Sequence, residues 1–181
     1  MLKFAFIINM PGQSPDTYCG KYENAESCSI IAGTDGIDET KKLVKKLVAD
    51  DFTLFNLCGD FDDAMTAQIR AVTGGDVKIV HSDYSSEEMK KMEKLSSLSE
   101  YGIIVKMDGV EHPEQVDIKC DDCNTHAVFV KDMPQAENAA KKLRADGADF
   151  IELCSWFDGE RTEAIINAVD GNIPVGTCGE L

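Results

Sequence analysis

The segments KKLVAD at 45–50 and LCGDFD at 57–62 occur a second time, as KKLRAD at 141–146 and LCSWFD at 153–158. Both repeats are offset by 96 residues, and 12 of the 46 positions that this offset aligns around them are identical. Average residue usage would give roughly 3 identities by chance in such a comparison. The sequence therefore predicts that the chain contains two copies of one structural unit.

The residues around these segments predict the same series of elements in both copies. Each has a strand, a polar stretch, a second strand, and then helix, strand, helix and strand. Continuous apolar strands connected by helices pair in parallel. We therefore expect an α/β fold, a tandem duplication of a β-β-α-β-α-β unit with largely parallel sheets flanked by helices. The expected strands cover 3–9, 28–32, 53–58 and 77–81 in the first copy, and 101–106, 127–130, 149–154 and 173–177 in the second.

The segment between the copies has its own pattern. Ser85-Ser86-Glu87-Glu88 is typical of a capping box at the start of a helix, and apolar residues then follow at helical spacing. We expect three parts: a first α/β repeat over 1–83, a helical linker over 84–100, and a second α/β repeat over 101–181.

The charge balance bears on the possible partners. The 181 residues include 18 basic and 33 acidic side chains, a formal net charge of −15. Phosphate backbones and anionic lipid surfaces repel such a chain, so we expect no nucleic-acid or membrane partner. A small molecule is the partner we favour, and self-association is compatible with the composition.

Apolar runs and cysteines indicate the compartment. The longest apolar run, Phe4–Ile8, is far shorter than the ~20 residues that cross a bilayer. The 7 cysteines are spread over the whole chain, unlike the dense framework of a small secreted protein. We therefore expect a cytoplasmic protein whose cysteines are thiols.

A motif links the two copies to a known family. Leu-Cys-x-x-Phe at 57–61 and 153–157 precedes an amphipathic helix, and a Gly-x-(Val/Ile)-x-(Val/Ile) strand follows that helix. This arrangement resembles a bacterial domain family of unknown function with about one hundred residues, within the usual size of one domain. Each half of the chain looks like one copy, so the resemblance implies a tandem pair. It implies the fold and no particular activity.

The carboxyl ends of the strands are the expected ligand site, because open parallel sheets bind ligands at that edge. Polar, small and aromatic residues follow the strands there in both copies. A single Trp at such a place walls a pocket or covers the core. The candidate ligand-binding residues are Asn9, Gly12, Gly59, Asp83, Cys154, Trp156, Thr177 and Gly179.

Cys58 and His81 are the candidate catalytic pair. If their strands are neighbours, the imidazole could take a proton from the thiol while Asp60 or Asp83 orients the ring. The alternative is a packing role for Cys58, because cysteine is often buried as a small apolar residue. Cys154 repeats the cysteine, whereas Thr177 replaces the histidine, and this difference favours packing.

Cys120 and Cys123 form a Cys-x-x-Cys pair, with His126 and His112 nearby in the sequence. Two thiolates and two imidazoles could make a tetrahedral zinc site, and a redox pair is a second interpretation. One Cys-x-x-Cys is only half of a zinc signature, so we favour two loop thiols without zinc. The sequence identifies no cofactor.

These observations leave the function unknown and several hypotheses open. Our best hypothesis is a small-molecule-binding or sensory α/β protein, with its site at the carboxyl ends of the strands or between the repeats. The alternatives are a thiol-dependent enzyme that uses Cys58 with His81 and a metal-binding protein that uses Cys120 and Cys123. The sequence does not decide whether the chain is an enzyme.

Overall fold

Two five-stranded sheets contain all the named strands of the computed structural model, which describes residues 1–181. One sheet belongs to a unit over Met1–Ser82 and the other to a unit over Asp83–Leu181. Each sheet is mixed but mostly parallel and is flanked by helices. This confirms the expected α/β fold class.

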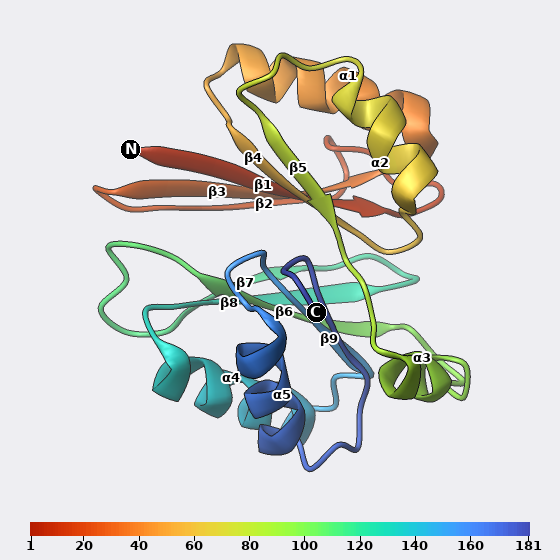
Figure 1. The fold of residues 1–181 in the computed structure, drawn as a ribbon, viewed down its shortest axis with the longest axis vertical. Coiled ribbons are helices and arrows are strands. Elements are labelled where there is room, and N and C mark those ends of the chain that lie inside the picture. The colour runs from red at the N-terminus through yellow and green to blue at the C-terminus, as the bar shows by residue number, and fades with distance from the viewer. The chain divides into compact units, whose positions relative to one another are not determined.

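The first unit has the strand order β2-β3-β1-β4-β5, with β1 at the centre. Strand β2 is antiparallel to β3, and the other neighbours pair in parallel. Helices α1 and α2 lie on the same side of this sheet (Figure 1). The elements are β1 (Leu2–Asn9), β2 (Cys19–Glu23), β3 (Ser27–Thr34), α1 (Gly36–Ala49), β4 (Leu54–Cys58), α2 (Asp63–Arg70) and β5 (Lys78–His81).

The second unit has the corresponding strand order, β7-β8-β6-β9-β10, with β6 at the centre and an antiparallel pair at the β7 edge. Helices α4 and α5 lie on the same side of this sheet (Figure 1). The elements are α3 (Ser86–Met92), β6 (Glu100–Lys106), β7 (Glu114–Ile118), β8 (Asn124–Val130), α4 (Met133–Ala145), β9 (Phe150–Leu153), α5 (Gly159–Ala168) and β10 (Val175–Thr177).

Each unit contains one strand more than the expected β-β-α-β-α-β series. Strands β2 and β7 lie where the sequence shows only a polar stretch. Both are antiparallel edge strands, and most of their side chains are exposed or half-buried. Exposed edge strands carry charged residues instead of an apolar run, so hydrophobic pattern does not reveal them.

Aspartates begin three of the helices. The Asp62 side chain accepts a hydrogen bond from the Met65 amide at the start of α2. Asp132 and Asp158 do the same for α4 and α5. These caps satisfy amides that have no partner within the helix, so they fix where each helix begins after its strand.

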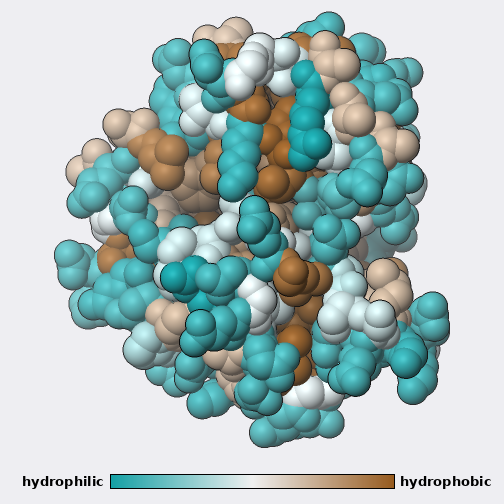
Figure 2. All heavy atoms as spheres, in the orientation of Figure 1, coloured by the Kyte–Doolittle hydropathy of each residue, from teal (hydrophilic) through white to brown (hydrophobic).

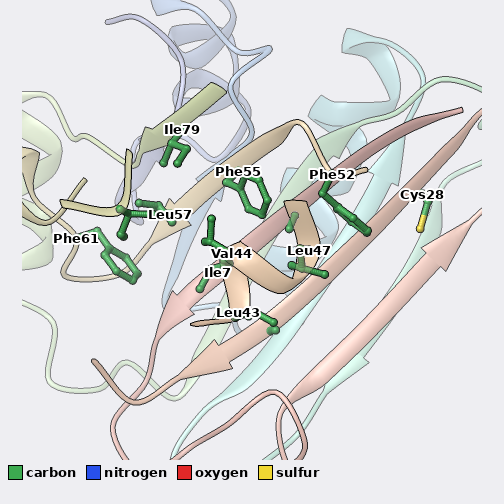
Figure 3. Packing of buried hydrophobic residues seen from close by; sticks show 13 residues of the cluster. Ile7, Cys28, Leu43, Val44, Leu47, Phe52, Phe55, Leu57, Phe61 and Ile79 are labelled. Carbon is green, nitrogen blue, oxygen red and sulfur yellow. The ribbon is translucent and has the colours of Figure 1, made fainter. Parts of the chain in front are cut away.

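The core of the first unit lies between the sheet and its helices. Leu43, Val44 and Leu47 of α1 belong to the same buried cluster as Ile7 of β1 and Phe55 of β4 (Figure 3). Their spacing along α1 is that of one helical face, which the sheet covers. The cluster therefore packs α1 against β1 and β4.

The second unit buries a carboxylate on the sheet face opposite α4. Glu152 of β9 is 2 % exposed, and it accepts hydrogen bonds from the hydroxyls of Tyr84, at 2.7 Å, and Tyr101. The Tyr101 ring also stacks on Phe150, with 4.5 Å between the ring centroids. A buried carboxylate is costly unless such partners satisfy it, so the two tyrosines are required for this packing.

The helix α3 covers only Ser86–Met92 of the expected helical linker over 84–100, and the residue that it buries is the charged Glu88. Glu88 is 3 % exposed and accepts a hydrogen bond from the Val175 amide at 2.9 Å, whereas Met89 is 45 % exposed. The contact attaches α3 to β10, so this helix belongs to the second unit.

None of the helices has the length and apolarity that a membrane crossing demands. The surface seen in Figure 2 is mostly hydrophilic, in keeping with the charged composition.

Gly176→Ala tests the packing of Tyr84. A Cβ atom on Gly176 would lie 2.6 Å from Cζ of the Tyr84 ring, so the ring must move and its bond to Glu152 must weaken. We expect a loss of about 1–3 kcal/mol in the free energy of unfolding, measured by urea denaturation. Gly74→Ala is the control, because nothing lies within 4 Å of its Cβ position. Equal stabilities of the two variants would contradict this packing.

Candidate functional site

The carboxyl edge of the first sheet brings Asn9 and Gly59 together. The Asn9 side-chain oxygen accepts a hydrogen bond from the Gly36 amide at 3.1 Å, at the start of α1. Gly59 has φ +85°, and a Cβ there would lie 3.4 Å from the Asn9 carbonyl oxygen. Gly12 has φ +79° in an open turn with nothing within 4 Å of its Cβ position. The asparagine thus caps a helix, and the glycines serve turns.

The structure does not bring Cys58 and His81 together as a catalytic pair. Strands β4 and β5 are neighbours, but their register pairs His81 with Leu57. Successive side chains of a strand point to opposite faces, so Cys58 and His81 lie on opposite faces of the sheet. His81 Nδ1 is hydrogen-bonded to the Thr66 hydroxyl at 3.2 Å, and Asp60 is exposed in the turn after β4.

Alkylation of Cys58 tests this separation. Cys58 is completely buried, so we expect iodoacetamide to modify it at least about tenfold more slowly than the exposed Cys19. We expect His81→Gln to leave the Cys58 rate unchanged at neutral pH. Mass spectrometry of digested protein measures both rates. Rapid labelling that His81→Gln abolishes would instead restore the thiol–imidazole pair.

The carboxyl edge of the second sheet is fixed by its last strand. The Thr177 hydroxyl donates to the Phe157 carbonyl at 2.8 Å and accepts from the Gly179 amide at 3.0 Å. A Cβ on Gly179 would lie 1.9 Å from the Phe157 oxygen, so only glycine fits. Asp83 is paired through its backbone with Thr177. These contacts hold the loop after β9 against the end of β10.

Cys154 begins that loop but is not a reactive thiol. Its sulfur accepts a hydrogen bond from the Lys106 amide at 3.4 Å. Burial raises the pKa of the Cys154 thiol to about 11. The thiolate is the nucleophilic form, so at neutral pH this cysteine contributes packing.

Trp156 is held by an arginine of the following helix. The Arg161 guanidinium lies 4.3 Å from the centroid of the Trp156 ring, a cation–π contact. Arg161 also donates to the Trp156 carbonyl at 3.1 Å and to the Asp158 carboxylate at 2.8 Å. Three contacts therefore fix the arginine and orient the half-buried indole at the carboxyl edge.

A cleft of about 290 Å³ lies beside this arginine. Its walls come from the first turns of α4 and α5, which follow β8 and β9 at the carboxyl edge. Three carboxylates and one guanidinium line it, a formal charge of −2 (three negative, one positive). The lining residues are Met133, Glu137, Asp158, Glu160, Arg161 and Ala164.

The four candidate metal ligands do not converge. Cys120 and Cys123 lie in the β7–β8 loop, whereas the β7–β8 register pairs His126 with Asp117, and His112 is exposed before β7. No group of three or more His, Cys, Asp or Glu side chains is arranged to hold a metal ion. The hairpin register therefore separates the histidines from the thiols.

His126 instead lies between two carboxylates. Its Nδ1 is 2.7 Å from Asp117 and its Nε2 is 2.8 Å from Glu100. Burial acts to lower the pKa of His126, but the hydrogen bonds to the two carboxylates outweigh it and the pKa is raised. The pKa of Glu100 is lowered, chiefly by its bond to His126. Near neutral pH the cluster favours an imidazolium between two carboxylates.

The cluster predicts a pH dependence of stability. The pKa of His126 is raised above its ordinary 6.5, so its charged form stabilises the fold fully below about pH 6.5. That contribution is lost as the pH rises through the folded-state pKa. We expect His126→Gln to remove this decline from urea denaturation measured between pH 5.5 and 8.5. The exposed His112→Gln is the control, and a wild-type decline in His126→Gln would contradict the assignment.

Comparison with known proteins identifies the family. The model of a family described as "Family of unknown function (DUF6506)" matches residues 2–97 and 99–179, nearly the whole chain. The chain belongs to this family. No curated protein matches the sequence.

Among solved structures, this DUF6506 chain is similar to a carbohydrate transporter from Acidothermus cellulolyticus 11B, crystallised in complex with myo-inositol. The identity is 12 %, the TM-score is 0.32, and the match covers 97 % of this chain and 73 % of that chain. A TM-score this low supports no conclusion about function.

The sequence analysis overlooked Arg161 and the cluster of His126. A spacing of three residues between Asp158 and Arg161 on a helix is a detectable signal for such a pair. No local signal connects Glu100 with His126, because only the pairing of β6 with β8 brings them onto one face. The Asp158–Arg161 pair follows from the cap of α5, and the His126 cluster follows from the register of β6 and β8.

Proposed function

We propose that this DUF6506 protein binds a small molecule in the cleft between the first turns of α4 and α5. The observation that carries the proposal is the cleft beside the fixed Trp156–Arg161 pair, at the carboxyl edge of a mostly parallel sheet. Ligands of open α/β sheets bind at this edge. The second unit supplies every residue that the proposal requires.

The volume and lining define the kind of ligand. About 290 Å³ is close to the lower end of the range for small-molecule sites, ~300–1,000 Å³, so the ligand is small. Met133 and Ala164 supply apolar contacts, and Glu137 and Glu160 supply acceptors. Asp158 already neutralises Arg161. The excess of carboxylates selects a neutral or cationic ligand with hydroxyl or ammonium donors.

Trp156 provides the readout, because it is the only tryptophan of the chain. Its indole N–H gives one NMR resonance that reports directly on the surroundings of the cleft. We expect some members of a library of small polyols and primary amines to shift this resonance in a saturable manner. A library of carboxylates and phosphates of similar size is the comparison, and we expect no saturable shift from it.

A matched pair of variants tests the location of the site. Glu137→Gln with Glu160→Gln removes two cleft carboxylates, so binding should weaken by at least about tenfold, because the loss of a single charged hydrogen bond already has that effect. Glu163 lies on α5, the same helix as Glu160, but outside the cleft lining. The control variant Glu163→Gln should therefore leave the affinity unchanged. Equal affinities of both variants would place the site elsewhere, and the lack of any saturable shift would contradict the proposal.

A further inference from the structure

The turn between β7 and β8 places two cysteines in contact. The Cys120 sulfur lies 3.3 Å from the amide nitrogen of Cys123, which donates to it, and 3.1 Å from the Cys123 carbonyl oxygen. The pair is separated by only Asp121 and Asp122. The Cys120 thiol is therefore folded over the turn onto the backbone of the second cysteine.

We propose that Cys120 and Cys123 are a redox modification site, which a hydroperoxide oxidises to an intrachain disulfide. This site is independent of the cleft between α4 and α5. It fits the chemistry of a Cys-x-x-Cys pair and needs no metal, in agreement with the lack of a converging ligand set.

The turn folds the sulfur of Cys120 onto the residue that it would bridge. The Cys120 sulfur is in contact with both polar backbone atoms of Cys123. The Cys123 sulfur is directed along the chain, 3.8 Å from the Asn124 carbonyl. Formation of the bond requires the Cys123 side chain to turn from the Asn124 carbonyl toward the Cys120 sulfur.

Accessibility and mutual contact together select this pair among the 7 cysteines. Both Cys120 and Cys123 are half-buried, and neither forms a disulfide in the structure. Cys28, Cys58, Cys154 and Cys178 are buried, so they are shielded from a dissolved oxidant. Cys19 is exposed and lies in β2, whereas Cys120 and Cys123 lie in contact in one turn. A peroxide that oxidises one sulfur of the turn pair therefore leaves a second cysteine beside it to complete the disulfide.

The reaction balances with hydrogen peroxide as the oxidant. One sulfur attacks a peroxide oxygen, the O–O bond breaks, and a sulfenic acid and water form. The second sulfur then attacks the sulfenic sulfur, the S–O bond breaks, and a second water leaves. In total two thiols lose two protons and two electrons, and one peroxide becomes two waters.

The new bond would change the surroundings of His126. Asn124 follows Cys123 directly, and its side-chain amide donates to Glu100 at 2.8 Å. The other oxygen of Glu100 contacts His126. Closing the ring at Cys123 therefore alters the end of a hydrogen-bonded chain that leads to the imidazole. The His126 ring resonances are a second readout of oxidation.

Peroxide treatment of the folded full chain tests the site. We expect a loss of two hydrogen atoms in the intact mass and a fall from seven to five titratable thiols after denaturation. Peptide mapping should place the bond between Cys120 and Cys123, and dithiothreitol should reverse it. The His126 ring resonances should shift with the same time course.

Single variants separate the pair from the other thiols. Cys120→Ser and Cys123→Ser should each lose the intrachain bond, and dimedone should trap a sulfenic acid on the remaining thiol. Cys19→Ser is the control and should oxidise like the wild type. A bond that includes another cysteine, or sulfinic acid at Cys120 and Cys123 without a bond, would overturn the proposal.

Discussion

Backbone pairing across the central strands decides where every functional side chain points. Strand β1 is bonded on both sides over most of its length, and β6 has the same place in the second sheet. Because side chains alternate between faces, a shift of one residue would exchange the two faces completely. This register places His81 beside α2 and puts Cys58 on the other face. It also brings Glu100 and His126 onto one face.

The two similar units carry different side chains at corresponding strand ends. At the end of β5, His81 bonds to Thr66 of α2, whereas the corresponding Thr177 of the second unit bonds to the Phe157 backbone. After β4, Asp60 is exposed. At the corresponding position after β9, Trp156 contacts Arg161. The two similar units thus keep the positions of the strand ends while the side chains there differ. The second unit combines an oriented aromatic ring with a charged cleft.

Sequence reasoning succeeded where the signal is local. The apolar runs of the central strands and the amphipathic helices between them are patterns of residues close together in the chain, and they predicted the α/β class. It failed where the cause is non-local. The charged edge strands lack an apolar run, and the register of β4 against β5 cannot be deduced from residue spacing. The Trp156 position was identified from its strand end, but its partner Arg161 was missed.

The exposed edges of the two sheets have a consequence for concentrated protein. A bare edge strand offers unpaired amides and carbonyls to a neighbouring copy, which is how fibrils grow. Lys21 and Glu23 form an ion pair along β2, and Glu114 and Asp117 place like charges along β7. A second copy stacked on β7 would have to accommodate these charged side chains beside its own. The charged edges that concealed these strands from sequence analysis therefore oppose their polymerisation.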